Sequence, residues 1–269
     1  RARLLGRRGD RTLSALAVYT LWRRELVRFL RQPSRLASAI GTPLIFWLLI
    51  GSGLTASFRL PDGPSTMSFL EYFFPGTLVL LVLFASIFAN ISVIEDRHEG
   101  FLQAVLVAPV GSVALVLGKV LGAASLSWLQ GALFLALAPL AGLRLGLVSL
   151  ATALGVIALL SLGLTALGFA MAWKVDSTQG FHGVMNLLLI PMWMLSGAFF
   201  PVSGAPVWLA TLMRANPLTY GTAALRRALY PAGTALGIEL PSMAASLAIL
   251  LGATVVALVF AALVARRPR

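Results

Sequence analysis

The chain has 269 residues, of which 59% are hydrophobic and only 11% are charged. A soluble globular domain has about half apolar and a quarter charged residues, so this composition indicates a protein surrounded by lipid. The absence of cysteine excludes disulfides, thiol chemistry and Cys-ligated metal sites. The net charge of +12 raises the question of a nucleic-acid partner, but the placement of the basic residues indicates membrane orientation instead.

Six apolar runs are long enough to cross about 30 Å of hydrocarbon as helices. Lipid offers no hydrogen-bond partner to an open strand edge, so each run is predicted to be α-helical. The predicted spans cover residues 36–58, 72–94, 112–138, 145–173, 181–200 and 242–265. Because the chain shows no long-period repeat and no low-complexity linker, we predict a single all-α membrane domain over residues 1–269.

The basic residues predict the orientation of these spans. If the N-terminus lies inside, 16 of the 21 Lys and Arg residues fall on the inner side of the membrane. Loops on the cytoplasmic side carry an excess of such residues, so both termini are predicted to be cytoplasmic. We therefore expect a multi-pass protein of a bacterial-type plasma (inner) membrane, with no nucleic-acid partner.

Residues 1–35 are predicted to lie along the inner membrane surface. In "YTLWRRELVRFLRQPSR", Trp22 belongs to an apolar helical face, whereas Arg24, Arg28 and Arg31 belong to the opposite face. The arginines would then meet anionic headgroups or a partner protein. The pattern fits an anchor that only sets the topology as well as it fits a helix that contacts a partner.

The predicted cytoplasmic loop after the second span has an unusual sequence, "EDRHEGFLQAVLVAPV" (95–110). Three of the nine acidic residues of the chain lie in its first five positions, and Gly100 follows them. Phe101, Leu102, Val105 and Leu106 then recur at helical spacing, and Pro109 ends the pattern. The loop is predicted to be a short helix with an apolar ridge that a partner covers; the alternative is a solvated connector.

The segment 201–241 is too polar and too rich in proline to cross the membrane. It contains two short helical stretches, 207–215 and 219–230, separated by Asn216 and Pro217. Each is long enough only to dip into the outer leaflet. The arginines of this segment, Arg214, Arg226 and Arg227, would meet outer headgroups or substrate.

The loop 95–110 and the stretch "LSGAFFPVSGAPVWLATLMRANPLTY" (195–220) resemble the two signatures of the membrane subunits of type-2 ABC exporters, the ABC-2 permeases. The resemblance covers nearly the whole chain and is greater to drug and nodulation-factor exporters than to polysaccharide exporters. The chain departs from the family pattern at Phe101, where Thr is usual, and at Gln103, where Glu is usual.

The resemblance implies that the loop is a coupling helix docked on a separate ATPase subunit. Its predicted coupling residues are Glu95, Asp96, Arg97, Gly100, Phe101, Leu102, Val105, Leu106 and Pro109. The resemblance also implies two ATPase chains and a second permease chain, as a homodimer or a heterodimer. ATP and Mg²⁺ would bind the ATPase, and this chain would bind no cofactor. In the family, re-entrant helices close the outer exit, which assigns an outer gate to Pro201, Asn216 and Pro217.

The stretch 184–200 is the expected lining of a substrate pathway between two permease chains. Its adaptable, aromatic and polar side chains are Met185, Asn186, Met192, Trp193, Phe199 and Phe200. Such a wall suits a lipophilic or amphipathic substrate such as a drug, a lipid or a glycolipid. The alternative is that these side chains only pack helices together.

Enzyme chemistry has little support in the sequence. "GSVALVLGK" (111–119) has six residues between its glycines where a phosphate-binding loop has four, and His98 and His182 lack metal-ligand spacing. An ion-gradient-driven secondary transporter or channel is the alternative function. Such carriers usually bury ionisable residues at mid-membrane, and the predicted spans contain no buried carboxylate there. The sequence therefore favours transport driven by ATP.

Overall fold

The computed structural model describes residues 2–31, 33–55, 67–102, 105, 111–230 and 240–266, and the side chains of these ranges except 2–13, 33–40 and 55. All regular structure in this part of the chain is helical. The long helices are α1 (Ala2–Leu30), α2 (Pro33–Thr55), α3 (Phe69–Phe88), α6 (Ser112–Leu135), α7 (Leu147–Lys174), α8 (Thr178–Trp193) and α11 (Met243–Ala265). The short ones are α4 (Ile91–His98), η1 (Ala138–Ala141), η2 (Met194–Ala198), η3 (Val202–Gly204), α9 (Val207–Ala215) and α10 (Pro217–Leu229).

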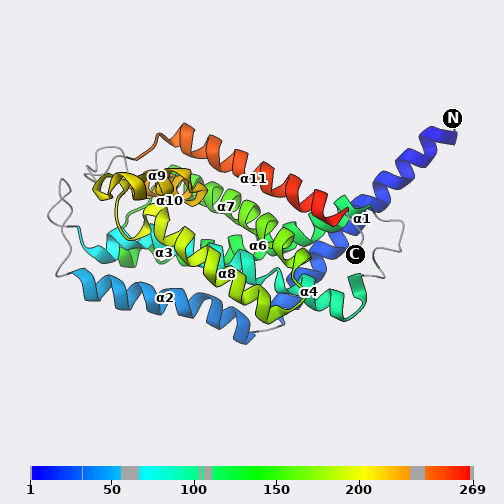
Figure 1. Cartoon of the computed structure of the whole chain (residues 1–269), viewed down its shortest axis with the longest axis horizontal. Helices are drawn as coiled ribbons and strands as arrows, with labels where there is room; N and C mark the ends of the chain where they lie inside the picture. The colour runs from blue at the N-terminus through cyan, green and yellow to red at the C-terminus, as the bar shows by residue number, and fades with distance from the viewer. Residues whose placement is uncertain are drawn as a thin grey trace.

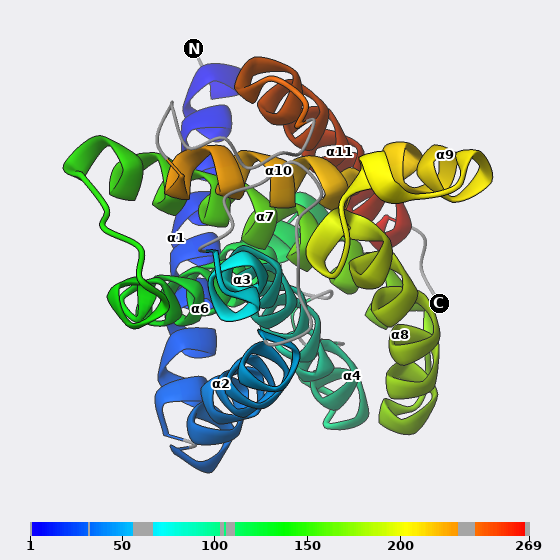
Figure 2. The ribbon, with the colours of Figure 1, turned by 90° about the vertical axis from the view of Figure 1, so that its left-hand side faces the viewer.

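The helices α2, α3, α6, α7, α8 and α11 run along the long axis of the molecule and form a bundle (Figure 1). Helix α1 crosses one end of this bundle, beside α4. Helix α10 lies across the opposite end, close to α9 (Figure 2). We call these the α1 end and the α10 end.

Helix α3 is the centre of the bundle and packs against α2, α6, α7 and α10. It is apolar on all sides, which is typical of a helix surrounded by other helices. Phe73 and Phe74, for example, are completely buried. Helix α11 packs mainly on α7 and buries only 17% of its apolar window, against 78% for the segment that contains α3. The apolar outer face of α11 therefore suits contact with lipid.

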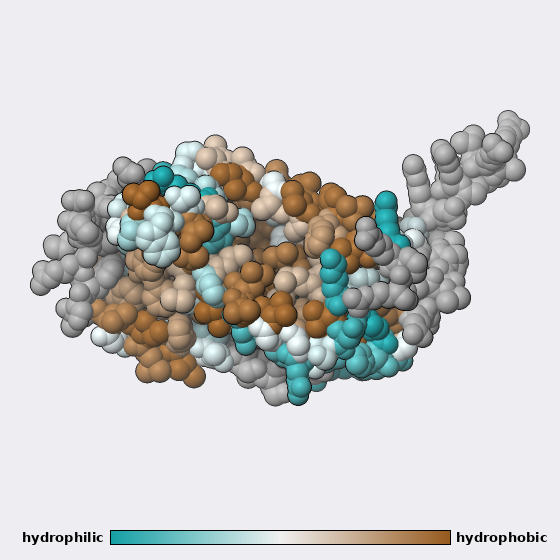
Figure 3. Space-filling view, viewed as in Figure 1, coloured by the Kyte–Doolittle hydropathy of each residue, from teal (hydrophilic) through white to brown (hydrophobic). Residues whose placement is uncertain are grey.

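Five helical segments are long and apolar enough to cross a membrane: Phe69–His98, Ser112–Leu135, Leu147–Lys174, Thr178–Ala198 and Met243–Ala265. They coincide with the second to sixth predicted spans. The first predicted span falls on α2, whose described apolar part, Gly41–Leu54, is shorter. On the face drawn in Figure 3, hydrophobic residues cover the middle of the bundle, and polar residues gather around α4 and the neighbouring end of α8.

Two of the predicted spans are interrupted. The second has a turn between α3 and α4, where the Asn90 side chain donates hydrogen bonds to the carbonyl oxygens of Ser86 at 2.7 Å and Thr165 at 3.2 Å. The fifth changes from α8 to the π-helical turn η2, which contains Gly197 at φ = 80°. Only glycine adopts this conformation without strain, so the chain leaves the helix axis there.

Close packing of α1 on α6 depends on two glycines one helical turn apart, Gly118 and Gly122. A Cβ atom at Gly118 would lie 2.7 Å from the Cβ of Leu21, and one at Gly122 would lie 2.7 Å from the Cβ of Glu25. Small residues at this spacing let two helix backbones approach closely. These two glycines therefore leave the space in which α1 packs against α6.

Replacing Gly122 by Val is expected to push α1 away from α6 and to destabilise the protein by about 1–3 kcal/mol, the usual cost of overpacking. Gly155→Val is the matched control, because a Cβ at Gly155 in α7 meets nothing within 4 Å. Thermal unfolding of the purified variants measures the effect. Equal melting temperatures for the two variants would show that the packing of α1 on α6 does not depend on a glycine at position 122.

Candidate functional site

Six charged side chains from α1, α4 and α6 meet at the α1 end and form an ion cluster. Its members are Arg24, Glu25, Arg28, Glu95, Asp96 and Lys119. The three carboxylates balance the three cations. Charges removed from water are tolerated only when they are paired and hydrogen-bonded, so this balance is a condition for bringing the three helices together.

Asp96 is at the centre of the ion cluster and is completely buried. Arg24 donates to both of its carboxylate oxygens, at 2.9 and 2.8 Å, and Arg28 donates to one of them at 3.0 Å. Lys119 donates to Asp96 as well. The hydrogen bond to Asp96 raises the pKa of Arg24 above its usual value, although burial acts in the opposite direction.

Lys119 is the contribution of α6 to the ion cluster. Its ammonium donates to Glu25 Oε1 at 2.6 Å, and both side chains are buried. Sequence reasoning gave neither residue a role. A signal was present, however, because Lys119 is the one charged residue of the predicted span 112–138. A lysine inside an apolar span indicates a buried acidic partner.

Arg97 fixes the other side of α4 to the C-terminal end of α7. Its guanidinium donates to the carbonyl oxygens of Trp173 at 2.7 Å, Val175 at 3.1 Å and Ala172 at 3.2 Å. The last carbonyl groups of a helix have no partner within it and carry a partial negative charge. Arg97 therefore caps α7, and the neighbouring residues Asp96 and Arg97 attach α4 to different helices.

The chain turns at Gly100, whose φ is 76°, and the predicted coupling ridge follows. Leu102 is only 3% exposed and belongs to the core of this chain. The guanidinium of Arg24 lies 3.9 Å from the centre of the Phe101 ring, and Val105 packs against the core in part. The prediction that this ridge lacks cover within the chain is therefore wrong for Leu102. Leu106 and Pro109 lie outside the described residues.

The predicted orientation of α1 is also wrong in part. Arg24 and Arg28 face α4, because the carboxylates of the ion cluster attract them. Trp22 donates from its indole to Ser125 of α6 at 3.1 Å. The side chain of Arg31 is exposed, as are the apolar side chains of Tyr19 and Leu30. The face turned to the protein is thus partly charged, and part of the apolar face is free for lipid.

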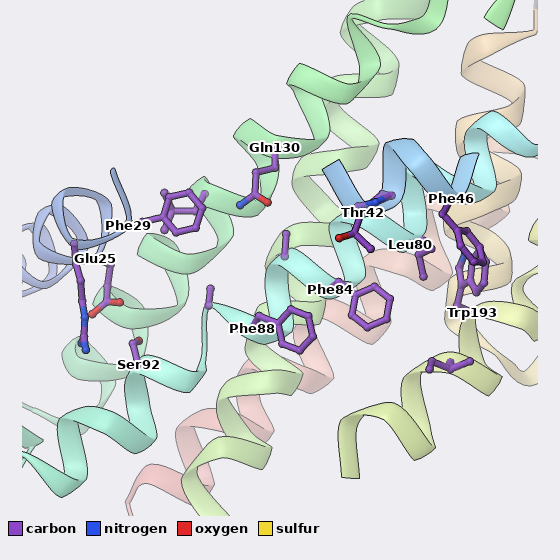
Figure 4. A pocket seen from close by; sticks show the side chains of 16 residues that line it. Glu25, Phe29, Thr42, Phe46, Leu80, Phe84, Phe88, Ser92, Gln130 and Trp193 are labelled. Atoms are coloured by element: carbon purple, nitrogen blue, oxygen red, sulfur yellow. The ribbon is translucent and has the colours of Figure 1, made fainter. Parts of the chain in front are cut away.

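A cavity of about 520 Å³ extends from the ion cluster along α2, α3, α6 and α8. Glu25 and Ser92 lie near one end, and Phe46 and Trp193 lie near the other (Figure 4). Its walls are Glu25, Arg28, Phe29, Thr42, Pro43, Phe46, Leu80, Phe84, Ala85, Phe88, Ala89, Ser92, Leu126, Gln130, Ile190 and Trp193. Its volume falls in the range of ligand pockets, about 300–1,000 Å³.

The predicted pathway residues do not share one surface. Met185 is completely buried, and Trp193 is 3% exposed and donates to the carbonyl oxygen of Gly76 at 2.7 Å. Asn186 is exposed, whereas Met192, Phe199 and Phe200 are half-buried. Of the six, only Trp193 is among the residues that line the cavity. Most of the other aromatic residues in its walls, Phe46, Phe84 and Phe88, come from α2 and α3.

The predicted outer gate residues lie at the α10 end. Asn216 caps α10 by accepting a hydrogen bond from the Leu218 amide at 3.1 Å, and it donates to the carbonyl oxygen of Met192 at 2.5 Å. Pro217 is in the first turn of α10, where a proline needs no amide partner. Pro201 lies between η2 and η3. Asn216 therefore connects α10 to the end of α8.

The long apolar helices and the apolar surface of the bundle define a multi-pass membrane protein. Residues 17–230 match the family model described as ABC-2 type transporter, and the chain belongs to this family. Permeases of the family are transport subunits that work with separate ABC ATPase subunits.

Two relatives illustrate the family. The chain is 31% identical to nodulation protein J of Rhizobium leguminosarum bv. trifolii over 211 residues. This alignment covers 77% of this chain and 78% of that protein. It is 27% identical to the daunorubicin resistance ABC transporter permease protein DrrB1 of Streptomyces coeruleorubidus over 238 residues. That alignment covers 86% of this chain and 80% of DrrB1.

Asp96→Asn is expected to leave the cations around it without their central counter-charge. Breaking a buried ion pair in this way costs about 3–5 kcal/mol. Glu95→Gln is the matched control: this carboxylate is 29% exposed, so water screens its ion pair with Arg28, and its loss is expected to cost less than the loss of the buried Asp96 carboxylate. Thermal unfolding compares the two variants, and equal losses would contradict the central role of Asp96.

Proposed function

We propose that this chain is the membrane subunit of an ATP-driven exporter that moves a lipophilic or amphipathic molecule outward. A separate ATPase binds ATP and Mg²⁺ and docks on the segment 95–109, while this chain binds no cofactor of its own. The observation that carries the proposal is the double attachment of α4. Asp96 ties it to α1 and α6, and Arg97 ties it to α7.

This attachment suits the transmission of force. A displacement of the docked segment pulls on three helices at once, because the ion cluster and the cap of α7 are both buried or half-buried polar contacts that are costly to break. A solvated connector would need neither contact. His98 and Glu99 are exposed beside the attachment points and would face the ATPase.

The proposed membrane arrangement has six spans, with α2 as the first. Both termini and the α1 end lie in the cytoplasm of a bacterial-type cell, and the whole of residues 1–269 forms one domain. At the α10 end, α9 and α10 dip into the outer leaflet as re-entrant helices. The complete transporter contains two ATPase chains and two permease chains, as a homodimer or as a heterodimer with a related permease.

The cavity is the proposed place for substrate within this chain. Its walls are mostly apolar, with Gln130 as a polar group and charged residues at the α1 end. An amphipathic molecule fits this gradient, with its apolar part between α2, α3 and α8 and its polar part near Glu25 and Arg28. The names of the relatives support such a substrate, since DrrB1 is named for resistance to daunorubicin.

Two single-cysteine variants test the topology and the docking surface, since the chain has no cysteine of its own. Ser203→Cys, in the exposed turn η3 before α9, is expected to react with an impermeant maleimide from outside intact cells. Glu99→Cys is expected to react only in opened membranes, and more slowly when the ATPase is present. Labelling of Glu99→Cys from outside would contradict the topology, and no protection by the ATPase would contradict the docking site.

Transport in membrane vesicles separates the two energy sources. With its ATPase present, the permease is expected to transport a fluorescent amphipathic drug such as daunorubicin when ATP is supplied and ionophores have collapsed the proton and sodium gradients. Arg97→Gln is expected to reduce this transport while the ATPase still co-purifies, because it releases α4 from α7. Gradient-driven transport by this chain alone would favour a secondary transporter.

A further inference from the structure

Arg226 is a buried cation at the α10 end. It lies on α10 and is 2% exposed, unlike Arg214 and Arg227, which are exposed. Its Nε and Nη2 groups have no hydrogen-bond acceptor, and no carboxylate in the described part of the chain forms an ion pair with it. Arginine keeps its charge at physiological pH, so a whole positive charge is buried here with unused donors.

The surroundings of Arg226 stabilise its charge only in part. The guanidinium lies 4.2 Å from the centre of the Tyr72 ring, a favourable cation–π contact. The broken end of α8 at Gly197 is also close, since a Cβ at Gly197 would lie 3.9 Å from Nη1. Neither neighbour accepts hydrogen bonds from Nε or Nη2. A buried ion without a full counter-charge is strongly unfavourable, so the site calls for an anion.

A small cavity of about 20 Å³ adjoins Arg226. Ser196, Thr219 and Thr222 line it, but their hydroxyl groups donate to backbone carbonyl oxygens of Trp193, Leu195 and Leu218. The free donors of Arg226 are therefore the recognition groups of this cavity. Its volume holds one occupant of about the size of a water molecule. A water molecule would satisfy a donor but would leave the charge of Arg226 without compensation.

We propose that Arg226 forms an anion-binding site at the α10 end, which takes a chloride-sized ion or a single oxygen of a carboxylate or phosphate group. Two adjacent N–H donors of a guanidinium match such groups in geometry and in charge. The inference rests on the contacts of Arg226 and holds whether or not the transporter is driven by ATP.

Anion-dependent thermal unfolding tests the site. The purified 269-residue chain is placed in nanodiscs of zwitterionic lipid in a zwitterionic buffer, and sodium chloride or sodium formate is added; Arg226→Gln at the same salt concentration corrects for ionic strength. A ligand that binds only the folded state raises the melting temperature, here by about 2 °C or more at saturation. Arg226→Gln is expected to lose this response, and Arg214→Gln, an exposed arginine of α9, is expected to keep it. Arg226→Lys, which retains the charge without the two adjacent N–H donors of the guanidinium, is expected to respond at a severalfold higher anion concentration.

The source of the anion is distinguished by a second probe, octyl phosphate, compared with octyl glucoside. A response to chloride and formate alone identifies a free ion; a stronger response to octyl phosphate, which removes the response to chloride, identifies the acidic group of a larger molecule. Both outcomes support the site. A wild-type protein that responds to none of these anions overturns it, as does an equal response in Arg226→Gln.

One further variant covers a carboxylate of the chain itself. Glu239 precedes Leu240, which lines the small cavity, and it lies outside the described residues. If Glu239 were the counter-charge of Arg226, the wild type would not respond and Glu239→Gln would gain the response to chloride. That result would replace the external ligand by an internal ion pair.

Discussion

The structure of the α1 end depends on the cost of placing charge away from water. Asp96 has no exposure, and an isolated carboxylate in such a position would be several kcal/mol less stable than in water. It is tolerated because Arg24, Arg28 and Lys119 converge on it from two other helices. The positions of α1, α4 and α6 relative to one another follow from this requirement.

The close packing of α1 on α6 also serves to pair the buried charges. The carboxylate of Glu25 reaches Lys119 only because Gly122 lets the α1 backbone approach α6. A larger residue at that position would separate the two ions, and Lys119 would keep only its ion pair with Asp96. Small residues and charged residues at this end are therefore parts of one arrangement, and a change in either affects the other.

The sequence predicts the helices better than their contacts. Long apolar runs identify spans because lipid imposes the same length and hydrogen-bond requirement on every helix. The start of α10 was also predictable, since Asn216 and Pro217 act on their own backbone. The rotation of α1 was not, because it is decided by carboxylates about 70 residues further along the chain, which the helical pattern of α1 does not contain.

At the candidate site, too, the sequence identifies the segment but not its contacts. The loop 95–110 was recognisable from its own residues, but the sequence assigned Asp96 and Arg97 to contact with an ATPase and did not predict their contacts with α1, α6 and α7. The burial of Leu102 by this chain was not predictable, because periodicity identifies an apolar ridge without saying what covers it. The cavity was missed for a similar reason, since its walls come from helices that are distant in sequence.

The two ends of the bundle are held by different kinds of interaction, so the loss of a contact has a different cost at each end. At the α1 end, ion pairs with buried members hold α4 to α1 and α6. At the α10 end, neutral hydrogen bonds such as that from Asn216 to the Met192 carbonyl oxygen hold α10 to the end of α8. Removing one partner of a buried neutral hydrogen bond costs about 1–3 kcal/mol, and removing one partner of a buried ion pair costs about 3–5 kcal/mol. Loss of one partner is therefore more costly at the contacts of α4 than at those of α10.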